Sequence, residues 1–166
     1  PGACSDSFGT RVPASGGTAL GAGRSLVAFT ESVTGLAPGA RYYVCALASN
    51  GVGTSFGELR TFALPGVPAV VTGAPVATSA SGATLTATVD PNLADTGAWF
   101  RYASSDPGAC NDTFGVRAPS ASNIAVGDGD GPVAIDQVIS GLAPATTYWA
   151  CAIATSVAGT GFGELV

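Results

Sequence analysis

The sequence contains no lysine, histidine or methionine, and its six basic residues are all arginine. Only 10% of its residues are charged, against roughly 25% in an average soluble domain. With scattered arginines and a net charge of −5, the chain is not expected to bind nucleic acid. The lack of lysine excludes Lys–Asn isopeptide crosslinks. Because no signal peptide and no apolar run of about 18 residues is present, no membrane-spanning segment is expected.

Glycine, alanine, threonine and serine replace the missing charges. Aromatic and β-branched residues are spread along the chain, so the composition is not that of a disordered protein. It is typical of an all-β protein with a weakly charged surface. Because near-neutral surfaces promote association, we expect contacts with neighbouring modules or chains. A monomer from a genome that favours alanine codons is the alternative.

The chain contains an internal repeat. Residues 1–60 align without a gap on residues 107–166, and 28 of these 60 pairs are identical. The repeat begins with Pro-Gly-Ala-Cys and ends with Phe-Gly-Glu-Leu in both copies. Self-similarity at a fixed offset, here 106 positions, indicates a modular array.

The four cysteines follow the repeat. Cys4 and Cys45 are 41 positions apart, and so are Cys110 and Cys151. Four cysteines allow three pairings, and only Cys4–Cys45 with Cys110–Cys151 treats the two copies alike. A zinc site is the alternative, although closely spaced cysteine pairs and histidines are absent. Disulfides predict an oxidising location, which is extracellular, periplasmic or at the cell surface, and the first and last are expected here.

Local sequence predicts an antiparallel β-sandwich without helices. Residues 84–89 alternate threonine with apolar residues, which is typical of a half-buried strand. Further strands are expected at 99–102, 133–139 and 147–155. A last strand is expected to begin at Phe162, after a turn at 159–161.

A family resemblance follows from two motifs. Residues 142–148, Leu-Ala-Pro-Ala-Thr-Thr-Tyr, resemble the L-x-P-x-T-x-Y stretch of fibronectin type III domains, and residues 36–42 are the earlier copy. Val89-Asp90-Pro91-Asn92 followed by Phe100-Arg101-Tyr102 is similar to the V-x-P-N…F-x-Y pattern of bacterial fibronectin III-like repeats. The resemblance implies tyrosine corners at Tyr42 and Tyr148. Leu85 replaces the usual core tryptophan.

The resemblance also predicts domain boundaries. Residues 69–166 are expected to form a nearly complete module, and residues 65–68 a stiff Pro/Gly linker. Residues 1–64 are expected to supply only the later strands of another module. Three explanations are open: the chain is part of a longer tandem array, it is processed from a longer precursor, or another chain donates the missing strands.

Strand parity predicts an aromatic outer face. If Tyr148 points inward, the alanines at 150, 152 and 154 do too, and the residues between them point outward. The outer face would then carry Trp99, Trp149, Ile153 and Cys151, with Tyr43 and Leu47 as counterparts in the first copy. Either the segment from Phe114 to Pro132 covers this face, or the face is an assembly or ligand surface.

No motif predicts an enzyme or a cofactor. Gly53-Thr54-Ser55-Phe56-Gly57 matches G-x-S-x-G, but no histidine is available and the second copy has Gly161 in place of Ser55. Asp128 and Asp130 are weak candidates for a calcium site. Asn111-Asp112-Thr113 matches a glycosylation sequon that the first copy lacks. Asp112 and Arg117, repeated as Asp6 and Arg11, are expected to form a loop-fixing ion pair.

These observations predict a structural segment of an extracellular repeat protein or filament. The alternative is an extracellular adhesion module that holds a carbohydrate or a protein ligand on the tryptophan face or the glycine-rich loops.

Overall fold

The computed structural model describes residues 2–166 and divides the chain into two compact units, Pro1–Ala63 (unit 1) and Leu64–Val166 (unit 2). Every strand pair is antiparallel, and no helix occurs among the described residues. The predicted all-β fold class is therefore confirmed. No helix able to cross a bilayer is found in this part of the chain.

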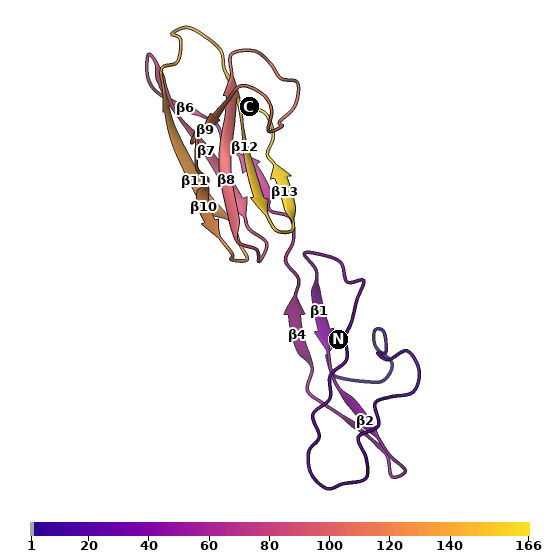
Figure 1. The fold of residues 1–166 in the computed structure, drawn as a ribbon. Coiled ribbons are helices and arrows are strands. Elements are labelled where there is room, and N and C mark those ends of the chain that lie inside the picture. The colour runs from indigo at the N-terminus through magenta and orange to yellow at the C-terminus, as the bar shows by residue number, and fades with distance from the viewer. Residues whose placement is uncertain (1) are drawn as a thin grey trace. The chain divides into compact units, whose positions relative to one another are not determined.

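Unit 2 is a sandwich of two sheets (Figure 1). In one sheet, β7 (Gly82–Asp90) is central and pairs with β11 (Val133–Ser140) on one side. On its other side it pairs with β5 (Ala69–Thr72) and β6 (Val76–Ser79), which follow one another along the same edge.

The second sheet is built around two long strands. β8 (Thr96–Ala103) pairs with β12 (Trp149–Ser156), and β12 pairs with β13 (Gly159–Phe162). The free edge of β8 is covered by β9 (Val116–Ala118) and β10 (Ile124–Gly127). Residue Val166 then pairs with Ala150 through two backbone hydrogen bonds of 2.9 Å.

The core of unit 2 lies between these two sheets. The alternating residues Leu85, Ala87 and Val89 of β7 are buried, as the period-two pattern predicts. They pack with Phe100 and with the alanines of β12, so the inward parity predicted for β8 and β12 is confirmed. Small alanines on β12 leave room for the fully buried Phe100 ring.

The segment 65–68 belongs to unit 2. The side-chain amide of Asn92 donates to the Val67 carbonyl (2.6 Å), and the Gly66 amide donates to the Asn92 carbonyl (2.8 Å). Asn92 lies in the turn after β7 with a positive φ of 50°, and Asp90 accepts its amide. The turn after β7 thus fixes residues 65–68, the expected linker, to unit 2.

The prediction for the last strand was wrong in its boundaries. The turn lies at Val157–Ala158, and Gly159–Phe162 is the strand itself. Its glycines are explained by close packing, because a Cβ at Gly161 would collide with the Pro68 carbonyl oxygen. A glycine in a strand often marks such a close approach of another backbone.

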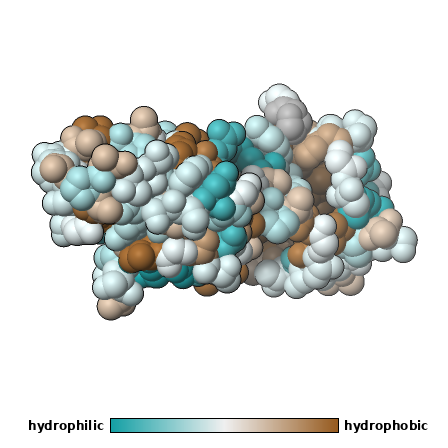
Figure 2. All heavy atoms as spheres, turned by 90° about the horizontal axis from the view of Figure 1, so that it is seen from above, coloured by the Kyte–Doolittle hydropathy of each residue, from teal (hydrophilic) through white to brown (hydrophobic). Residues whose placement is uncertain are grey.

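Unit 1 contains two small two-stranded sheets. β1 (Arg41–Val44) pairs with β4 (Arg60–Ala63), and β2 (Leu47–Ser49) pairs with β3 (Thr54–Phe56). No strand occurs among residues 2–40, and no residue of the described part of unit 1 is fully buried. The surface drawn in Figure 2 is mostly pale, with separate hydrophobic patches, in keeping with the low charge content.

The two copies of the repeat therefore fold differently. In unit 2, residues 116–118 and 133–140 are strands because β8 and β7 pair with them. The counterparts in unit 1, residues 10–12 and 27–34, are not strands. Since no described residue of unit 1 corresponds to β7 or β8, these segments lack the partners that would order them.

Candidate functional site

Each unit has one disulfide, paired as the repeat spacing predicts. Cys4 bonds to Cys45 and Cys110 to Cys151, and the Cα atoms of each pair are 5.9 Å apart. No cysteine is free among the described residues. In unit 2 the disulfide ties the loop after β8 to the centre of β12.

This disulfide lies in a second, smaller core on the outer face of the β8–β12 sheet. Trp99, Cys151 and Ile153 are buried there, packed against Cys110, Phe114 and Leu165. The interpretation of Trp99 and Ile153 as an exposed interface is therefore wrong. The face is covered, as the alternative expected, but by the loop 110–114 and the chain end near Leu165, and not by the whole segment 114–132.

A polar clamp holds the covering loop. The Asp112 carboxylate accepts one hydrogen bond from Nε1 of Trp99 (2.8 Å) and one from Nε of Arg101 (2.9 Å). Arg101 also donates to the carbonyls of Asp112 (2.5 Å) and Phe114 (3.4 Å). Because β8 supplies both donors, the clamp fixes the loop directly to that strand.

The predicted pairing of Asp112 with Arg117 was thus wrong, since the direct partner is Arg101. Arg117 instead lies with its guanidinium carbon 4.8 Å from the centroid of the Trp99 ring. It donates to the carbonyls of Pro119 and Ser122 and to the side chain of Asn123. Arg117 therefore closes its own loop and covers the tryptophan as a cation–π partner.

The clamp changes the acidity of Asp112. Partial burial alone would raise the pKa of this carboxyl. Hydrogen bonds from Arg101 and Trp99, together with the charges of Arg101 and Arg117, outweigh the burial and lower the pKa below its ordinary value of 3.8. The ionised clamp therefore stabilises unit 2 above that pH, and this contribution is lost as the pH falls through the lowered pKa.

We expect Asp112→Asn to lower the free energy of unfolding of unit 2 by about 1 kcal/mol at pH 7, because the ion pair is half exposed. The loss should shrink as the pH drops below about 4, because the carboxyl is then protonated in the unfolded chain and, on passing the lowered pKa, also in the folded one. Both tryptophans are in unit 2, so urea unfolding followed by tryptophan fluorescence reports this unit alone. Asp6→Asn in unit 1 is the matched control and should leave the transition unchanged. A loss that stays constant from pH 7 to pH 2 would contradict the electrostatic origin.

The two tyrosines make the contact that the resemblance implies. The Ala143 amide donates to the hydroxyl of Tyr148 (3.0 Å), and the Ala37 amide donates to the hydroxyl of Tyr42 (2.7 Å). Tyr148 also lies beside Tyr102, whereas Tyr42 stacks on Phe62. The same hydrogen bond therefore recurs although the aromatic partner differs.

The remaining members of the expected interface are more accessible. Trp149 is half-buried at the start of β12, Leu47 is half-buried, and Tyr43 is exposed on β1. Within unit 2, Trp149 and Trp99 do not form an exposed pair of rings, because Trp99 is buried beneath Arg117.

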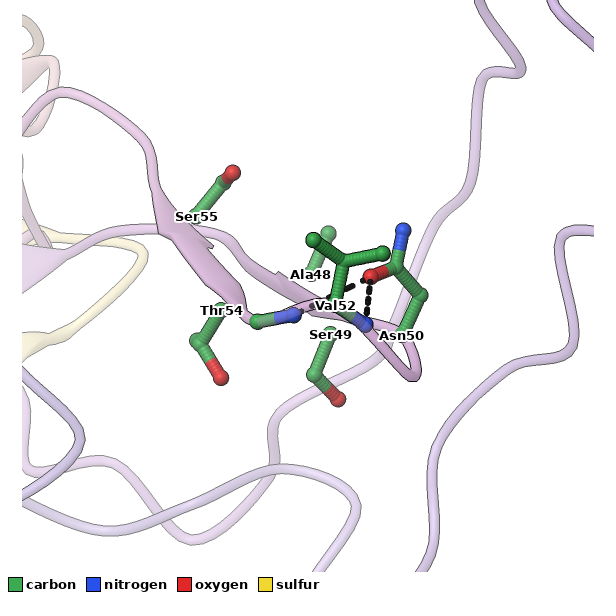
Figure 3. A pocket seen from close by; sticks show the side chains of 7 residues that line it. Ala48, Ser49, Asn50, Val52, Thr54 and Ser55 are labelled. Atoms are coloured by element: carbon green, nitrogen blue, oxygen red, sulfur yellow. Dashed lines mark hydrogen bonds between the residues drawn. The ribbon is translucent and has the colours of Figure 1, made fainter.

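A shallow pocket lies at the β2–β3 turn (Figure 3). The Asn50 side-chain oxygen accepts the amides of Val52 (2.8 Å) and Gly53 (3.2 Å), so it closes the turn on itself. Ser49 and Thr54 point to one side of the hairpin, and Ser55 points to the other. The lining has no titratable group, and Ser55 of the G-x-S-x-G motif lies on a strand instead of a strand-to-helix turn.

The weak metal candidates lie in an exposed loop. Asp128 and Asp130 flank Gly129, whose carbonyl accepts a hydrogen bond from the Leu93 amide. The amide of Gly131 donates to the side chain of Asp90 (3.1 Å). Within residues 2–166, no group of three or more carboxylate, cysteine or histidine side chains is arranged to hold a metal ion. In the sequon, Thr113 donates to the Asn111 side-chain oxygen through its amide (2.9 Å) and its hydroxyl (2.7 Å).

Comparison with protein-family models gave no match to this chain, and comparison with curated proteins gave none either.

Proposed function

We propose that the chain is a structural segment of an extracellular protein or filament built from tandem β-sandwich modules of the fibronectin III-like type. The observation that carries this proposal is that the same local structures recur at one fixed sequence offset. The disulfide, the tyrosine hydroxyl contact and the β2–β3 hairpin of unit 1 reappear in unit 2 at positions 106 residues later.

Further contacts repeat at the same offset. The Gly57 amide donates to the Ala46 carbonyl (2.8 Å), and the Gly163 amide donates to the Ala152 carbonyl (2.9 Å). Arg11 donates to the Gly16 carbonyl, as Arg117 does to the Ser122 carbonyl. Contacts that recur at one fixed offset are what a tandem array of equivalent modules would give, and such an array is a quasi-one-dimensional object that suits a mechanical role.

Three features support the family and the location. Unit 2 pairs its strands as two facing sheets around β7 and around β8–β12, the arrangement of an immunoglobulin-like sandwich. Its tyrosine hydroxyl contact matches a tyrosine corner. A disulfide in each unit is compatible with an oxidising, extracellular environment.

The adhesion alternative loses its main surface in unit 2. A carbohydrate platform needs exposed aromatic rings, and Trp99 lies beneath Arg117 and the Asp112 loop. No observation favours a particular ligand, so the structural role is the function we propose.

The test is to image recombinant arrays with two, four and six copies of the 106-residue period by electron microscopy. We expect particles whose length increases by a constant step for each added period, and that lengthen further by end-to-end assembly. Compact particles whose longest dimension does not grow with copy number, at any protein concentration, would overturn the proposal. The rods are expected to resist protease because a disulfide crosslinks each module, and reduction of the disulfides should remove this resistance.

A further inference from the structure

Unit 1 exposes apolar side chains at positions whose counterparts form the core of unit 2. Phe29 is 43% exposed, whereas its counterpart Ile135 is 7% exposed. Val44 is 47% exposed, whereas its counterpart Ala150 is 2% exposed. Val12 and Val33 are exposed in the same way relative to Ala118 and Ile139, and we call Val12, Phe29, Val33 and Val44 the open face.

Unit 2 shows what covers this surface in the other copy. There, Leu85 and Val89 of β7 and Phe100 of β8 pack on Ile135, Ile139 and Ala150. Both strands come from residues 69–103, and the described part of unit 1 has no counterpart of them. The backbone partners are open as well, because residues 10–12 and 27–34 remain outside any strand. An open apolar face with unpaired backbone is a site for strand addition.

Charge adds an independent constraint on the partner. In unit 2, Asp112 is held by Arg101 and Trp99, which both come from β8. The counterpart, Asp6, has no hydrogen-bond or ion-pair partner among the described residues. Arg11 keeps the loop contact of Arg117, but residues 1–63 contain no tryptophan that could pair with it as Trp99 pairs with Arg117.

We propose that unit 1 is a receptor for a two-strand polypeptide segment with the chemistry of residues 69–103. Its first strand would place apolar residues against Phe29 and Val33, as β7 does on the other copy. Its second strand would carry the order aromatic, Phe, Arg, so that the arginine and an indole N–H reach Asp6 while the phenylalanine covers Val44. The inference rests on the proposed modular array, but it concerns one module and does not depend on filament assembly.

The repeat supplies a direct experiment. Residues 64–106 are fused ahead of the complete chain, so that the junction Asp106–Pro1 reproduces the natural junction Asp106–Pro107. We expect the amides of residues 10–12 and 27–34 to become protected from hydrogen exchange by at least tenfold relative to the unfused chain. NMR should show a third structured indole N–H from the added Trp99. Unit 2, present in both proteins, is the internal reference.

Two variants of the added copy distinguish specific docking from nonspecific hydrophobic association. In the added copy, Phe100→Asp should abolish the protection of unit 1. Arg101→Asp in the added copy should lower it by about fivefold, and Asp6→Arg in the same chain should restore much of that loss. Gly9→Ala gives a third check. Gly9 has a φ of 65° and open space around it in the unfused chain, so alanine there meets only backbone strain. Its counterpart Gly115 also lies against Tyr102 of β8, so the substitution should impair the fused protein clearly more than the unfused one.

Other results would overturn the inference. If the added segment stays unprotected while unit 1 exchanges as before, unit 1 does not accept such a segment. If unit 1 becomes protected only as the concentration of the unfused chain rises, the open face pairs with a second copy instead. Arrays that fail to form rods while the fused unit 1 becomes protected would refute the proposed function alone. Rods that form without this protection would refute the inference alone.

Discussion

Removing the disulfide of unit 2 through Cys110→Ala together with Cys151→Ala is expected to lower its free energy of unfolding by about 4 kcal/mol. In the chain-entropy model, a crosslink between residues 41 positions apart restricts the unfolded chain by about this amount. The loss is large relative to the total stability of a domain of this size, about 5–15 kcal/mol. The midpoint of thermal unfolding should fall by roughly 15–30 °C.

The structure gives a second reason for a large effect. Cys151 is fully buried in the outer cluster with Trp99 and Ile153, so removing the sulfur atoms also removes packing. The loop with Asp112 would then be held by the clamp to β8 and by the packing of Phe114, without a covalent link to β12. The side-chain N–H protons that Trp99 and Arg101 donate to Asp112 should then exchange with solvent faster in the variant than in the wild type.

Tryptophan fluorescence during urea unfolding measures this effect because both tryptophans are in unit 2. The matched variant is Cys4→Ala with Cys45→Ala, which removes a disulfide of the same span from unit 1. It should leave the tryptophan transition within about 0.5 kcal/mol of the wild type, as expected when the crosslink belongs to a different compact unit. A loss below about 1 kcal/mol for the unit 2 variant would contradict the assignment of the disulfide as its main crosslink.

The sequence predicted the strands whose own pattern is strong. Residues 84–89 alternate, and 99–102 and 147–155 concentrate aromatic and apolar residues, so β7, β8 and β12 were expected close to where they lie. It did not predict β9, for a physical reason. Thr10-Arg11-Val12 and Val116-Arg117-Ala118 are alike, yet only the second is a strand, because β8 pairs with it. For such short edge segments the partner decides the structure, and local sequence carries little information.

The sequence predicted which residues share the outer face of the β8–β12 sheet, but it did not predict whether that face is covered. Strand parity correctly placed Trp99, Cys151 and Ile153 on one face, because side chains alternate along a strand. Parity cannot tell what covers a face. Arg101 was overlooked in the sequence, although it could have indicated the covering loop. Arg101 lies on the same face of β8 as Trp99 and pairs with Cys151 on the neighbouring strand β12. Its direct contact with Asp112 depends on how the loop folds back, which only the structure shows.

Gly115→Ala is the second substitution with a large expected effect, about 3 kcal/mol or more of lost stability in unit 2. Gly115 has a φ of 52°, in the left-handed region, where an alanine costs about 1–2 kcal/mol. A Cβ at this position would also collide with the Tyr102 carbonyl oxygen and the Ala103 side chain. The collision involves the backbone of β8, so relief requires the loop to move away from the strand at a further cost of about 1–3 kcal/mol.

Gly108→Ala separates these two contributions. Gly108 has a similar φ of 75°, but a Cβ there would meet no atom within 4 Å. Its cost should therefore be about 1 kcal/mol, since backbone strain is partly offset by the reduced freedom of the unfolded chain. Both variants are measured by the same urea transition of the tryptophans. Equal losses would mean that close packing of the loop against β8 does not contribute. A loss for Gly115→Ala that exceeds the control by about 2 kcal/mol would show that β8 holds this loop by contact. The strand proposed to dock on the open face of unit 1 would hold the loop around Gly9 in the same way.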